Sequence, residues 1–209
     1  MLIIAVNGGS ASGKTSFCYK LMERIKKHGI SVSVLSQDSF YKNLPHDVDP
    51  ANYNFDEPVA LDFDLMKKKI MELKSDMDDI EIPDYDFKTH QAIGTIKLKK
   101  CEVLIIEGIL IFSQKEIYEL ADVKVFIKAS PELRFARRIK RDVVDRGRNI
   151  DFVINSYLRF AVPSYNRYIA PNESNADFTI HNDTNDGDHT LVSKIKIIES
   201  HIMQHLNDK

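Results

Sequence analysis

The chain of 209 residues lacks the features that mark several protein classes. It has only two cysteines, Cys18 and Cys101, and no Cys-x-x-Cys pair, which fits a reducing compartment. Its formal net charge is −2, so no global charge favours nucleic acid or an anionic membrane as a partner. No uninterrupted apolar stretch could span a bilayer, and the N-terminal apolar run is too short for a signal peptide. We therefore expect a cytoplasmic protein with neither a membrane nor a nucleic-acid partner.

Internal repeats, low-complexity tracts and flexible linkers are also missing from the sequence. The hydrophobic fraction of 43% is ordinary for a globular protein. A chain of this length can bury a substantial core as one large domain. We therefore expect a single domain that covers residues 1–209, with one domain that carries a small inserted subdomain as the alternative.

Apolar runs and helical periodicities alternate along the chain, which predicts an α/β fold with a parallel sheet and helices on both faces. Two further apolar runs have no helix between them and predict an antiparallel β-hairpin, here called the flap (residues 79–98), appended to the main sheet. Pro163 is expected to kink or break the helix in which it lies. The expected strands of the main sheet cover residues 2–6, 30–35, 103–106, 123–127 and 178–180, and the expected helices cover residues 14–28, 64–73, 151–168 and 191–206, with another that begins at Pro131.

The most specific motif follows the first expected strand. Residues 8–15 read Gly-Gly-Ser-Ala-Ser-Gly-Lys-Thr and fit G-x-x-x-x-G-K-[ST] at every fixed position. Gly8 and Gly13 let backbone N–H groups turn inward around a phosphate, at a helix N-terminus whose dipole favours anions. Lys14 would reach the β- and γ-phosphates, and the Thr15 hydroxyl would ligate Mg²⁺. A chance Gly/Ser-rich turn is the weaker alternative between a strand and a helix. The motif predicts an ATP-binding site formed by Gly8, Gly9, Ser10, Ala11, Ser12, Gly13, Lys14, Thr15 and Ser16.

Two acidic residues follow expected strands, at the sheet edge where ligands bind in open α/β folds. Asp38 could face the γ-phosphate there and accept the proton of an attacking hydroxyl; alone, it would be interpreted as a turn or N-cap residue. Glu107 follows the apolar run 103–106, where enzymes with this phosphate loop hold the Mg²⁺ shell; the alternative is a solvated carboxylate. The predicted Mg²⁺ ligands are Thr15, Glu107 and Asp38.

A cluster of basic residues stands out in this slightly acidic chain. Arginines at spacings of three and four occupy neighbouring faces of one helix, and such a cluster could close over phosphates and neutralise the charge that develops during transfer. A nucleic-acid patch ranks second, because aromatic residues are not interleaved with the arginines. We call residues 134–150 the lid segment; its basic residues are Arg134, Arg137, Arg138, Lys140, Arg141, Arg146 and Arg148, interrupted by Asp142 and Asp145.

From about residue 3 to residue 185, the chain resembles the uridine kinases (uridine–cytidine kinases), in the wider group that includes phosphoribulokinase and bacterial pantothenate kinase. A series of motifs in the same order carries the resemblance. Besides the phosphate loop, they are Gln-Asp-Ser-Phe-Tyr-Lys at 37–42, Asn-Phe-Asp at 54–56, Pro-Asp-Tyr-Asp-Phe at 83–87 with His90, Glu-Gly-Ile at 107–109, Arg-Arg-Ile-Lys-Arg-Asp at 137–142, Arg-Gly-Arg at 146–148 and Ala-Asp at 176–177.

The resemblance implies a role for each matching residue. Asp38 would be the general base for a ribose 5′-hydroxyl, with Lys14, Arg141, Arg146 and Arg148 acting on the phosphates. Asp56 and Arg138 would hold the ribose 2′- and 3′-hydroxyls. Tyr85 and His90 would hydrogen-bond the pyrimidine edge, Phe55 and Phe87 would pack against the base, and Tyr41 lies in the same substrate loop. The resemblance also implies ATP as phosphate donor, Mg²⁺ and a homotetramer.

Two positions depart from the pattern of these kinases, and other functions remain as alternatives. Glu57 stands where the family usually has His, and Gln91 where Arg commonly follows His90. The same motifs would suit a relative that phosphorylates another alcohol, such as a sugar phosphate or pantothenate. A nucleotide sensor or a nucleic-acid-associated ATPase is the alternative from another class. Against a GTP-dependent switch, no Gly has an Asp three residues before it, and Asn-Lys-x-Asp is missing from the sequence.

Overall fold

The computed structural model describes residues 1–75, 78–183 and 189–207. Residues 184 and 185, at the end of the predicted resemblance, lie outside this range, as do 208 and 209 at the end of the predicted domain. The described strands are β1 (Leu2–Gly8), β2 (Val32–Ser36), β3 (Ile80–Asp86), β4 (Gln91–Leu98), β5 (Val103–Gly108), β6 (Val123–Lys128) and β7 (Phe178–His181). The described α-helices are α1 (Lys14–Lys26), α2 (Phe63–Lys74), α3 (Lys115–Tyr118), α4 (Pro131–Val144), α5 (Ile150–Ser156), α6 (Val162–Ser164) and α7 (His189–Asn207). Short 3₁₀ turns lie at Gln37–Phe40, Pro50–Asn52, Pro58–Ala60, Ile111–Ser113 and Ala170–Asn175.

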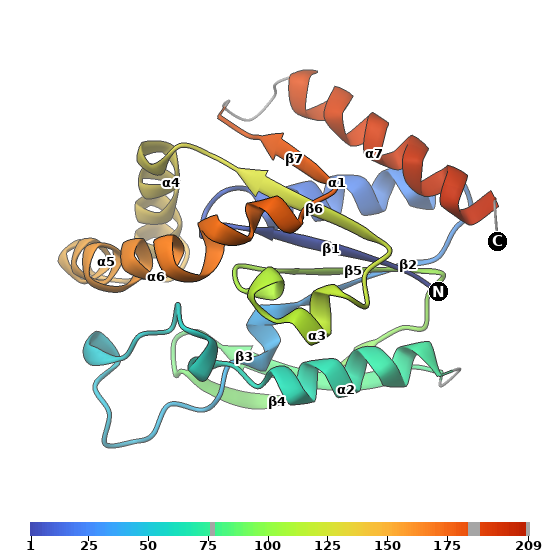
Figure 1. Ribbon diagram of the computed structural model, residues 1–209. Helices are drawn as coiled ribbons and strands as arrows, with labels where there is room; N and C mark the ends of the chain where they lie inside the picture. Colours follow the sequence, from blue (N-terminus) through green and yellow to red (C-terminus); the bar gives the residue numbers. More distant parts are fainter. Residues whose placement is uncertain (76–77, 184–188, 208–209) are drawn as a thin grey trace.

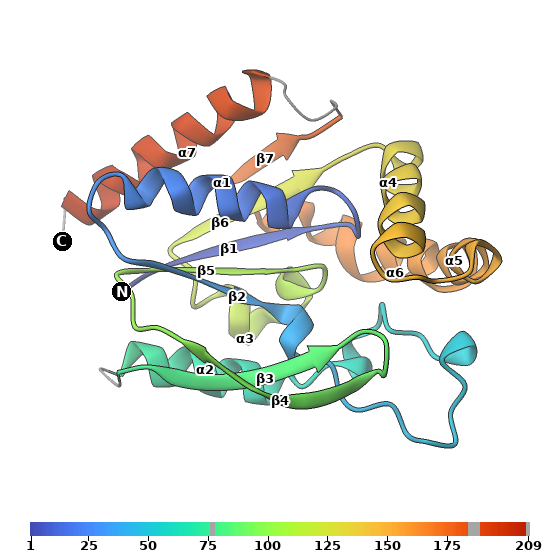
Figure 2. The same ribbon diagram turned by 180° about the vertical axis from the view of Figure 1, so that it is seen from behind.

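A parallel sheet in the strand order β2-β5-β1-β6-β7 forms the centre of the protein (Figure 1). Alternate residues of a strand point to opposite faces, and both faces of β1 are buried. Leu2, Ile4 and Val6 pack in one core with α1 and α7, and α1 lies in front of the sheet in Figure 2. Ile3 and Ala5 pack in a second core with α2 and the flap. The predicted fold class is therefore confirmed.

The register of the central strands brings the predicted site residues together. Ser36, the last residue of β2, pairs with Glu107 of β5, and Val6 of β1 pairs with the same Glu107 from the other side. Because the strands are parallel, their carboxyl ends meet at one edge of the sheet. This edge faces α4, α5 and α6 (Figure 1).

The flap differs from the prediction in one respect, because β3 and β4 form a separate two-stranded sheet and do not extend the main one. Ile80, Ile82 and Leu98 of the hairpin are buried in the core shared with α2. The inner face of the hairpin is therefore held by packing, and hydrogen bonds to Asn43 and Leu44 hold the other end, near the turn. Its register shifts at Asp84 and Tyr85, just before the turn.

Pro163 does not break the helical run that follows residue 150. α5 passes into a π-helical turn at Tyr157–Ala161, then α6, and then a second π-helical turn at Tyr165–Ile169. Proline lacks the N–H of the ordinary i→i−4 ladder, and a π-bulge is a common way for a helix to accommodate such a gap. The short helix α3 was not predicted, since four residues show no periodicity.

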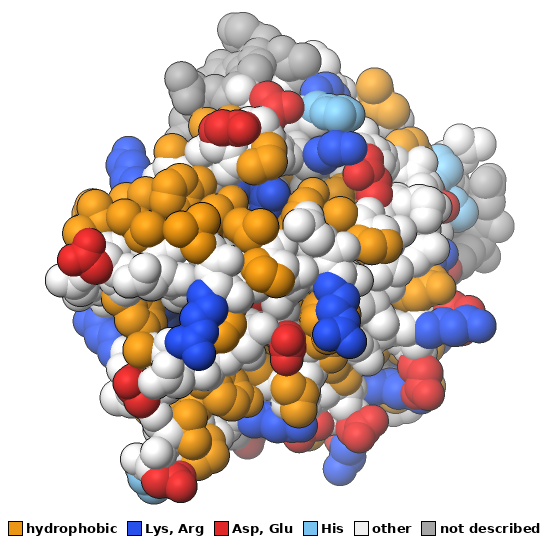
Figure 3. Space-filling view, turned by 60° about the vertical axis from the view of Figure 1, so that its left-hand side comes forward, with side chains coloured by type: hydrophobic (Ala, Val, Ile, Leu, Met, Phe, Trp, Pro, Cys, Tyr) orange, Lys and Arg blue, Asp and Glu red, His pale blue; other side chains and the backbone are white. Residues whose placement is uncertain are grey.

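No helix within the described residues combines the length and apolar character needed to cross a membrane. The described side chains visible in Figure 3 place acidic and basic groups among hydrophobic patches, without a continuous basic surface on that face.

Candidate active site

The phosphate loop joins β1 to α1 in a backbone conformation that its sequence explains. Gly8 and Gly13 have φ values of +153° and +96°, which side chains disfavour. A Cβ at Gly8 would lie 2.2 Å from the Ile127 carbonyl oxygen. Behind the loop, the Asn182 amide donates a hydrogen bond to the Ser12 carbonyl at 2.8 Å. Packing against Ile127 and the hydrogen bond from Asn182 thus fix the backbone of the loop in the conformation that a phosphate-binding loop needs.

Lys14 and the acidic residues of the sheet edge form a buried charged group. The Lys14 ammonium donates to the Gly9 carbonyl at 3.0 Å. Burial lowers the pKa of Lys14, while Glu107 and Asp38 partly oppose that change. Burial raises the pKa of Glu107, with the Lys14 charge acting in the opposite direction. Charged groups of both signs are therefore buried together here, and such groups with shifted pKa values are typical of catalytic sites.

Glu107 and Thr15 lie together where a metal shell was predicted. Glu107 Oε1 accepts hydrogen bonds from the hydroxyls of Thr15 at 3.3 Å and Ser36 at 3.0 Å. Among the described residues, no group of three or more His, Cys, Asp or Glu side chains could hold a metal by itself. Mg²⁺ in phosphoryl-transfer enzymes takes one or two protein oxygens together with substrate phosphates and water, so this oxygen pair fits that ion.

Asp38 begins the turn that follows β2. The Ser36 hydroxyl caps this turn by accepting a hydrogen bond from the Asp38 backbone N–H at 3.2 Å. Burial raises the pKa of the Asp38 carboxyl, and the positive charges of Arg146, Lys14 and Arg141 act against that rise. The carboxylate therefore lies between the phosphate loop and the lid segment, within reach of the charge of both.

Aromatic side chains line the side of the site opposite the phosphate loop. The rings of Phe55 and His90 are stacked, with centroids 4.7 Å apart and an angle of 19° between planes. Tyr41 contacts Tyr85 and Phe87 at centroid distances of 5.3 and 6.0 Å. Such a wall offers flat surfaces on which a planar ring could stack.

Two buried polar atoms in this wall have no protein partner. They are the Tyr85 hydroxyl and Nδ1 of His90, whose φ is +56°. Burial, followed by the charge of Arg148, lowers the pKa of His90. An unpaired buried polar atom costs about 1–3 kcal/mol, so these two atoms are candidates for contact with a polar ligand.

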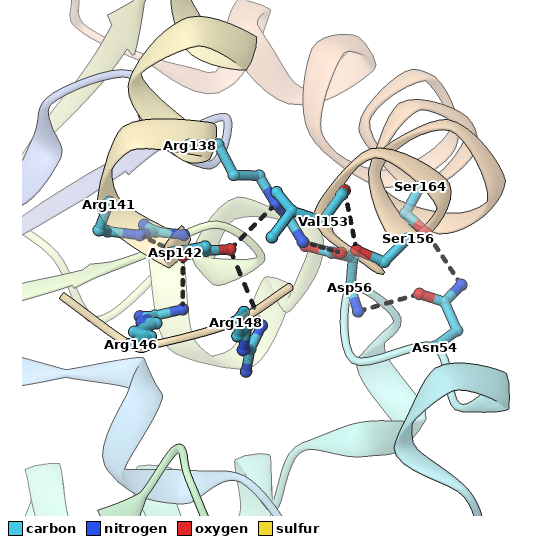
Figure 4. Close-up of polar contacts among 10 residues, drawn as sticks. All are labelled: Asn54, Asp56, Arg138, Arg141, Asp142, Arg146, Arg148, Val153, Ser156 and Ser164. Atoms are coloured by element: carbon cyan, nitrogen blue, oxygen red, sulfur yellow. Dashed lines mark hydrogen bonds and ion pairs between the residues drawn. The ribbon is translucent and has the colours of Figure 1, made fainter. Parts of the chain in front are cut away.

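Asp56 is held beside the wall by its own loop. The Asn54 amide donates to the Ser164 hydroxyl at 3.1 Å and its oxygen accepts the Asp56 backbone N–H at 3.0 Å (Figure 4). Asp56 Oδ2 then lies 3.6 Å from Nη2 of Arg138, and both side chains are nearly buried. Asn54 was recognised only as part of a motif, and its anchoring role was not predicted.

Four arginines of the lid segment, here called the lid arginines, converge on Asp142 (Figure 4). The exposed fractions of the four side chains are 9% for Arg138, 35% for Arg141, 21% for Arg146 and 18% for Arg148, against 1% for Asp142. Burial alone would raise the pKa of Asp142, but its hydrogen bond and ion pairs with arginines hold the pKa below its ordinary value. The sequence presented Asp142 only as an interruption of the basic run.

A single cavity of about 540 Å³ connects these groups. It is lined by most of the predicted site residues: Ser10, Ala11, Gly13, Lys14, Thr15, Ser16, Asp38, Tyr41, Phe55, Asp56, Phe87, His90, Glu107, Arg138, Arg141, Arg146 and Arg148. Gly8, Gly9, Ser12 and Tyr85 are outside the lining, where they support the loop and the wall. The cavity is also lined by three residues that were not predicted: Phe152, Ser156 and Phe160. Their spacing of four residues places them on one face of a helical run, and this spacing could have identified them from the sequence.

The two departures from the family pattern do not line the cavity. The Gln91 side-chain amide donates to the Leu44 carbonyl at 2.7 Å, which ties the flap to the preceding loop. Glu57 precedes the 3₁₀ turn at 58–60 and makes no capping hydrogen bond there.

Comparison with known proteins identifies the relatives of this chain. Residues 3–186 match the phosphoribulokinase / uridine kinase family. The chain is 41% identical over 209 residues to uridine-cytidine kinase A of Dictyostelium discoideum, covering 100% of itself and 40% of that protein. It is 37% identical over 210 residues to uridine-cytidine kinase B of the same organism, covering 99% of itself and 83% of that protein. Phosphoribulokinase from Rhodobacter spheroides has the same fold, with a TM-score of 0.64, 19% identity, and coverage of 86% of this chain and 69% of that one.

Proposed function

This chain belongs to the phosphoribulokinase / uridine kinase family, and we propose that it transfers the γ-phosphoryl group of ATP to the 5′-hydroxyl of uridine or cytidine. The products would be UMP or CMP and ADP, a reaction of pyrimidine salvage. The observation that carries the proposal is the single cavity, which a phosphate loop bounds on one side and an aromatic wall on the other, with Asp38 between them.

The donor side of the cavity suits ATP. The loop amides, Lys14 and the lid arginines would bind the triphosphate, and Thr15 and Glu107 would hold the shell of Mg²⁺ with Asp38 nearby. When bound, Mg²⁺ would supply positive charge that neutralises the phosphate oxygens. The Lys14 ammonium uses one of its three N–H donors on the Gly9 carbonyl, which leaves the other two for the phosphates.

The acceptor side suits a ribonucleoside. The base would lie against Phe55 and Phe87, and the unpaired Nδ1 of His90 and hydroxyl of Tyr85 would bind its polar edge. Asp56 and Arg138 would bind the two ribose hydroxyls, for which a carboxylate and a guanidinium supply an acceptor and donors. Tyr41 closes the side of the wall next to Asp38.

The chemistry follows from these positions. Asp38 would accept the proton of the 5′-hydroxyl as its oxygen attacks the γ-phosphorus, and Lys14, Arg141, Arg146 and Arg148 would stabilise the charge that develops on the transferred group. Closure of the cavity by the lid segment would keep water away, so the phosphoryl group goes to the sugar.

Two alternatives receive less support. A phosphorylated acceptor would need cations beside the flap in addition to those that act on ATP. The cations there, Arg146 and Arg148, already form ion pairs with Asp142, and the wall around His90 is otherwise aromatic. A nucleic-acid-associated ATPase would need an outward basic surface, whereas the lid arginines turn toward Asp142 (Figure 4). The homotetramer implied by the resemblance stays a prediction.

The test is a panel of acceptors. Consumption of Mg²⁺-ATP would be followed with uridine, cytidine, deoxyuridine, adenosine, ribulose 5-phosphate and pantothenate, and each product identified by mass. Turnover confined to uridine and cytidine is expected. Turnover of a non-nucleoside alone would keep Asp38 as base but refute the acceptor site, and turnover of no acceptor would refute the kinase itself.

A further inference from the structure

We propose that Asp142 is a positioning residue for phosphoryl transfer: its carboxylate holds the lid arginines ready for the donor phosphates and, through Arg138, links them to Asp56 on the acceptor side. The inference rests on the proposed kinase function and adds a residue to which the sequence assigned no role.

The contacts of Asp142 divide between its two oxygens. Oδ1 accepts a hydrogen bond from Nε of Arg141 at 2.8 Å and lies 3.2 Å from Nη1 of Arg146. Oδ2 lies 3.6 Å from Nε of Arg138 and 3.8 Å from Nη1 of Arg148. The Asp142 carbonyl also accepts the Arg148 backbone N–H at 2.9 Å. One residue thus holds the end of α4 and the loop after it together.

Gathering four guanidinium groups in a half-buried cavity is unfavourable unless an anion lies among them. In the described chain, Asp142 is the carboxylate that all four share. Aromatic rings support the far sides of two of them, because Arg146 lies over Phe87 at 4.1 Å and Arg148 over Phe152 at 5.6 Å. The arginines are therefore preorganised before any phosphate arrives, which is the condition for effective charge stabilisation in a transition state.

Arg138 joins the donor and acceptor sides. It lies 3.6 Å from Asp142 and 3.6 Å from Asp56, and its buried Nε has no hydrogen-bond partner. A ligand that binds Asp56 would weaken the ion pair between Asp56 and Arg138, and the Arg138 guanidinium could then move closer to Asp142. Acceptor binding would thereby change the ion pairs of the arginines on the other side of Asp142, including Arg141, which has no ring contact with the aromatic wall among the described contacts.

The experiment compares Asp142→Asn, Asp142→Glu and Glu132→Gln in the full chain. Glu132 is the matched control, because it is an exposed acidic residue on the same helix. Steady-state kinetics with uridine give kcat and both KM values, and calorimetry gives the affinity and stoichiometry of Mg²⁺-ATP with and without uridine.

For Asp142→Asn we expect kcat to fall by about 10- to 100-fold, the typical cost of misplaced catalytic groups. Its Mg²⁺-ATP affinity should not weaken, because the four cations remain and lose a competing anion. Uridine should no longer alter that affinity as it does in the parent. Asp142→Glu should recover part of kcat, and Glu132→Gln should match the parent.

A folded Asp142→Asn with parental kcat would overturn the inference. So would an equal loss of kcat and of Mg²⁺-ATP stoichiometry with no recovery by Glu, because that is the behaviour of a merely structural residue. If Asp142→Asn does not fold, arginine Nε–Hε NMR signals of the unaltered protein decide: uridine alone should shift the Arg141 signal, and an unshifted signal refutes the link. A parent that turns over no acceptor refutes the proposed function instead.

Discussion

Replacing Gly108 with alanine should destabilise the protein and slow turnover, because the added methyl group has no space. A Cβ there would lie 2.3 Å from Oε1 of Gln37 and 2.4 Å from its Cβ. Gln37 is not free to yield, since it is fully buried and its Oε1 accepts the Leu110 backbone N–H at 2.8 Å. Gln37 also precedes Asp38, so a displaced glutamine moves the proposed base.

The size of the effect follows from two costs. Displacing Gln37 leaves the buried N–H of Leu110 unpaired, which costs about 1–3 kcal/mol. Overpacking a core with one methyl group typically costs about 1–3 kcal/mol. Together they give about 2–6 kcal/mol of lost unfolding free energy, or roughly 4–24 °C of melting temperature for a chain of this size.

Urea denaturation and steady-state kinetics of the same preparations measure both consequences. Gly94→Ala is the matched control, because no atom lies within 4 Å of a Cβ at Gly94. The double variant Gly108→Ala/Gln37→Gly should lose less stability than the sum of its parts, because glycine also removes the Gln37 Cβ that lies 2.4 Å from the added methyl group. Equal stability of Gly108→Ala and Gly94→Ala would refute the reasoning.

Three further predictions concern the proposed site. Asp38→Asn should keep Mg²⁺-ATP affinity and lose about 10²- to 10⁴-fold in kcat; near-parental turnover in the folded variant would remove Asp38 as the base. Burial raises the pKa of Asp38, and the Arg146 charge opposes that rise. As the pH is lowered, kcat/KM should therefore begin to fall at a pH above the ordinary carboxyl range, because Asp38 becomes protonated. Arg146→Gln should move this acidic limb of the pH profile to higher pH. The exposed Lys140→Gln should leave the limb in place. Asp56→Ala should raise the KM for uridine by about 10- to 100-fold with little effect on ATP; equal effects on both would remove Asp56 from the acceptor site.

Local patterns were enough to predict the strands, the main helices and the phosphate loop. Glycines at Gly8 and Gly13, flanked by an apolar strand and a helix, leave few other structures open to residues 8–15. The hairpin was also predicted, but not its separation from the main sheet, because that depends on how Ile80 and Ile82 pack against α2.

The parts that could not be predicted depend on contacts between distant segments. Asp142 reads as an ordinary helical acid until the loop after α4 folds back and brings Arg146 and Arg148 to its carboxylate. The anchoring of Asn54 by Ser164 joins residues 110 positions apart. The effect of Pro163 depends on the π-helical turns on both sides of it, and no residue pattern in the sequence predicts such turns.

The unpaired polar atoms of the described chain explain why these contacts accumulate at one place. Buried side-chain atoms without a hydrogen-bond partner occur on Asn7, Ser12, Gln37, Tyr85, His90 and Arg138. Each of these residues lies in, or next to, the phosphate loop, the Asp38 turn, the aromatic wall or the lid segment, and none of them belongs to either hydrophobic core. At about 1–3 kcal/mol for each unpaired atom, the folded protein bears a large cost around one cavity of a marginally stable domain, which His90 and Arg138 line directly. Apolar groups of similar size would fill the same space without that cost. The grouping of these atoms beside the phosphate loop is what a site preorganised for polar ligands requires, since the ligands supply the missing partners.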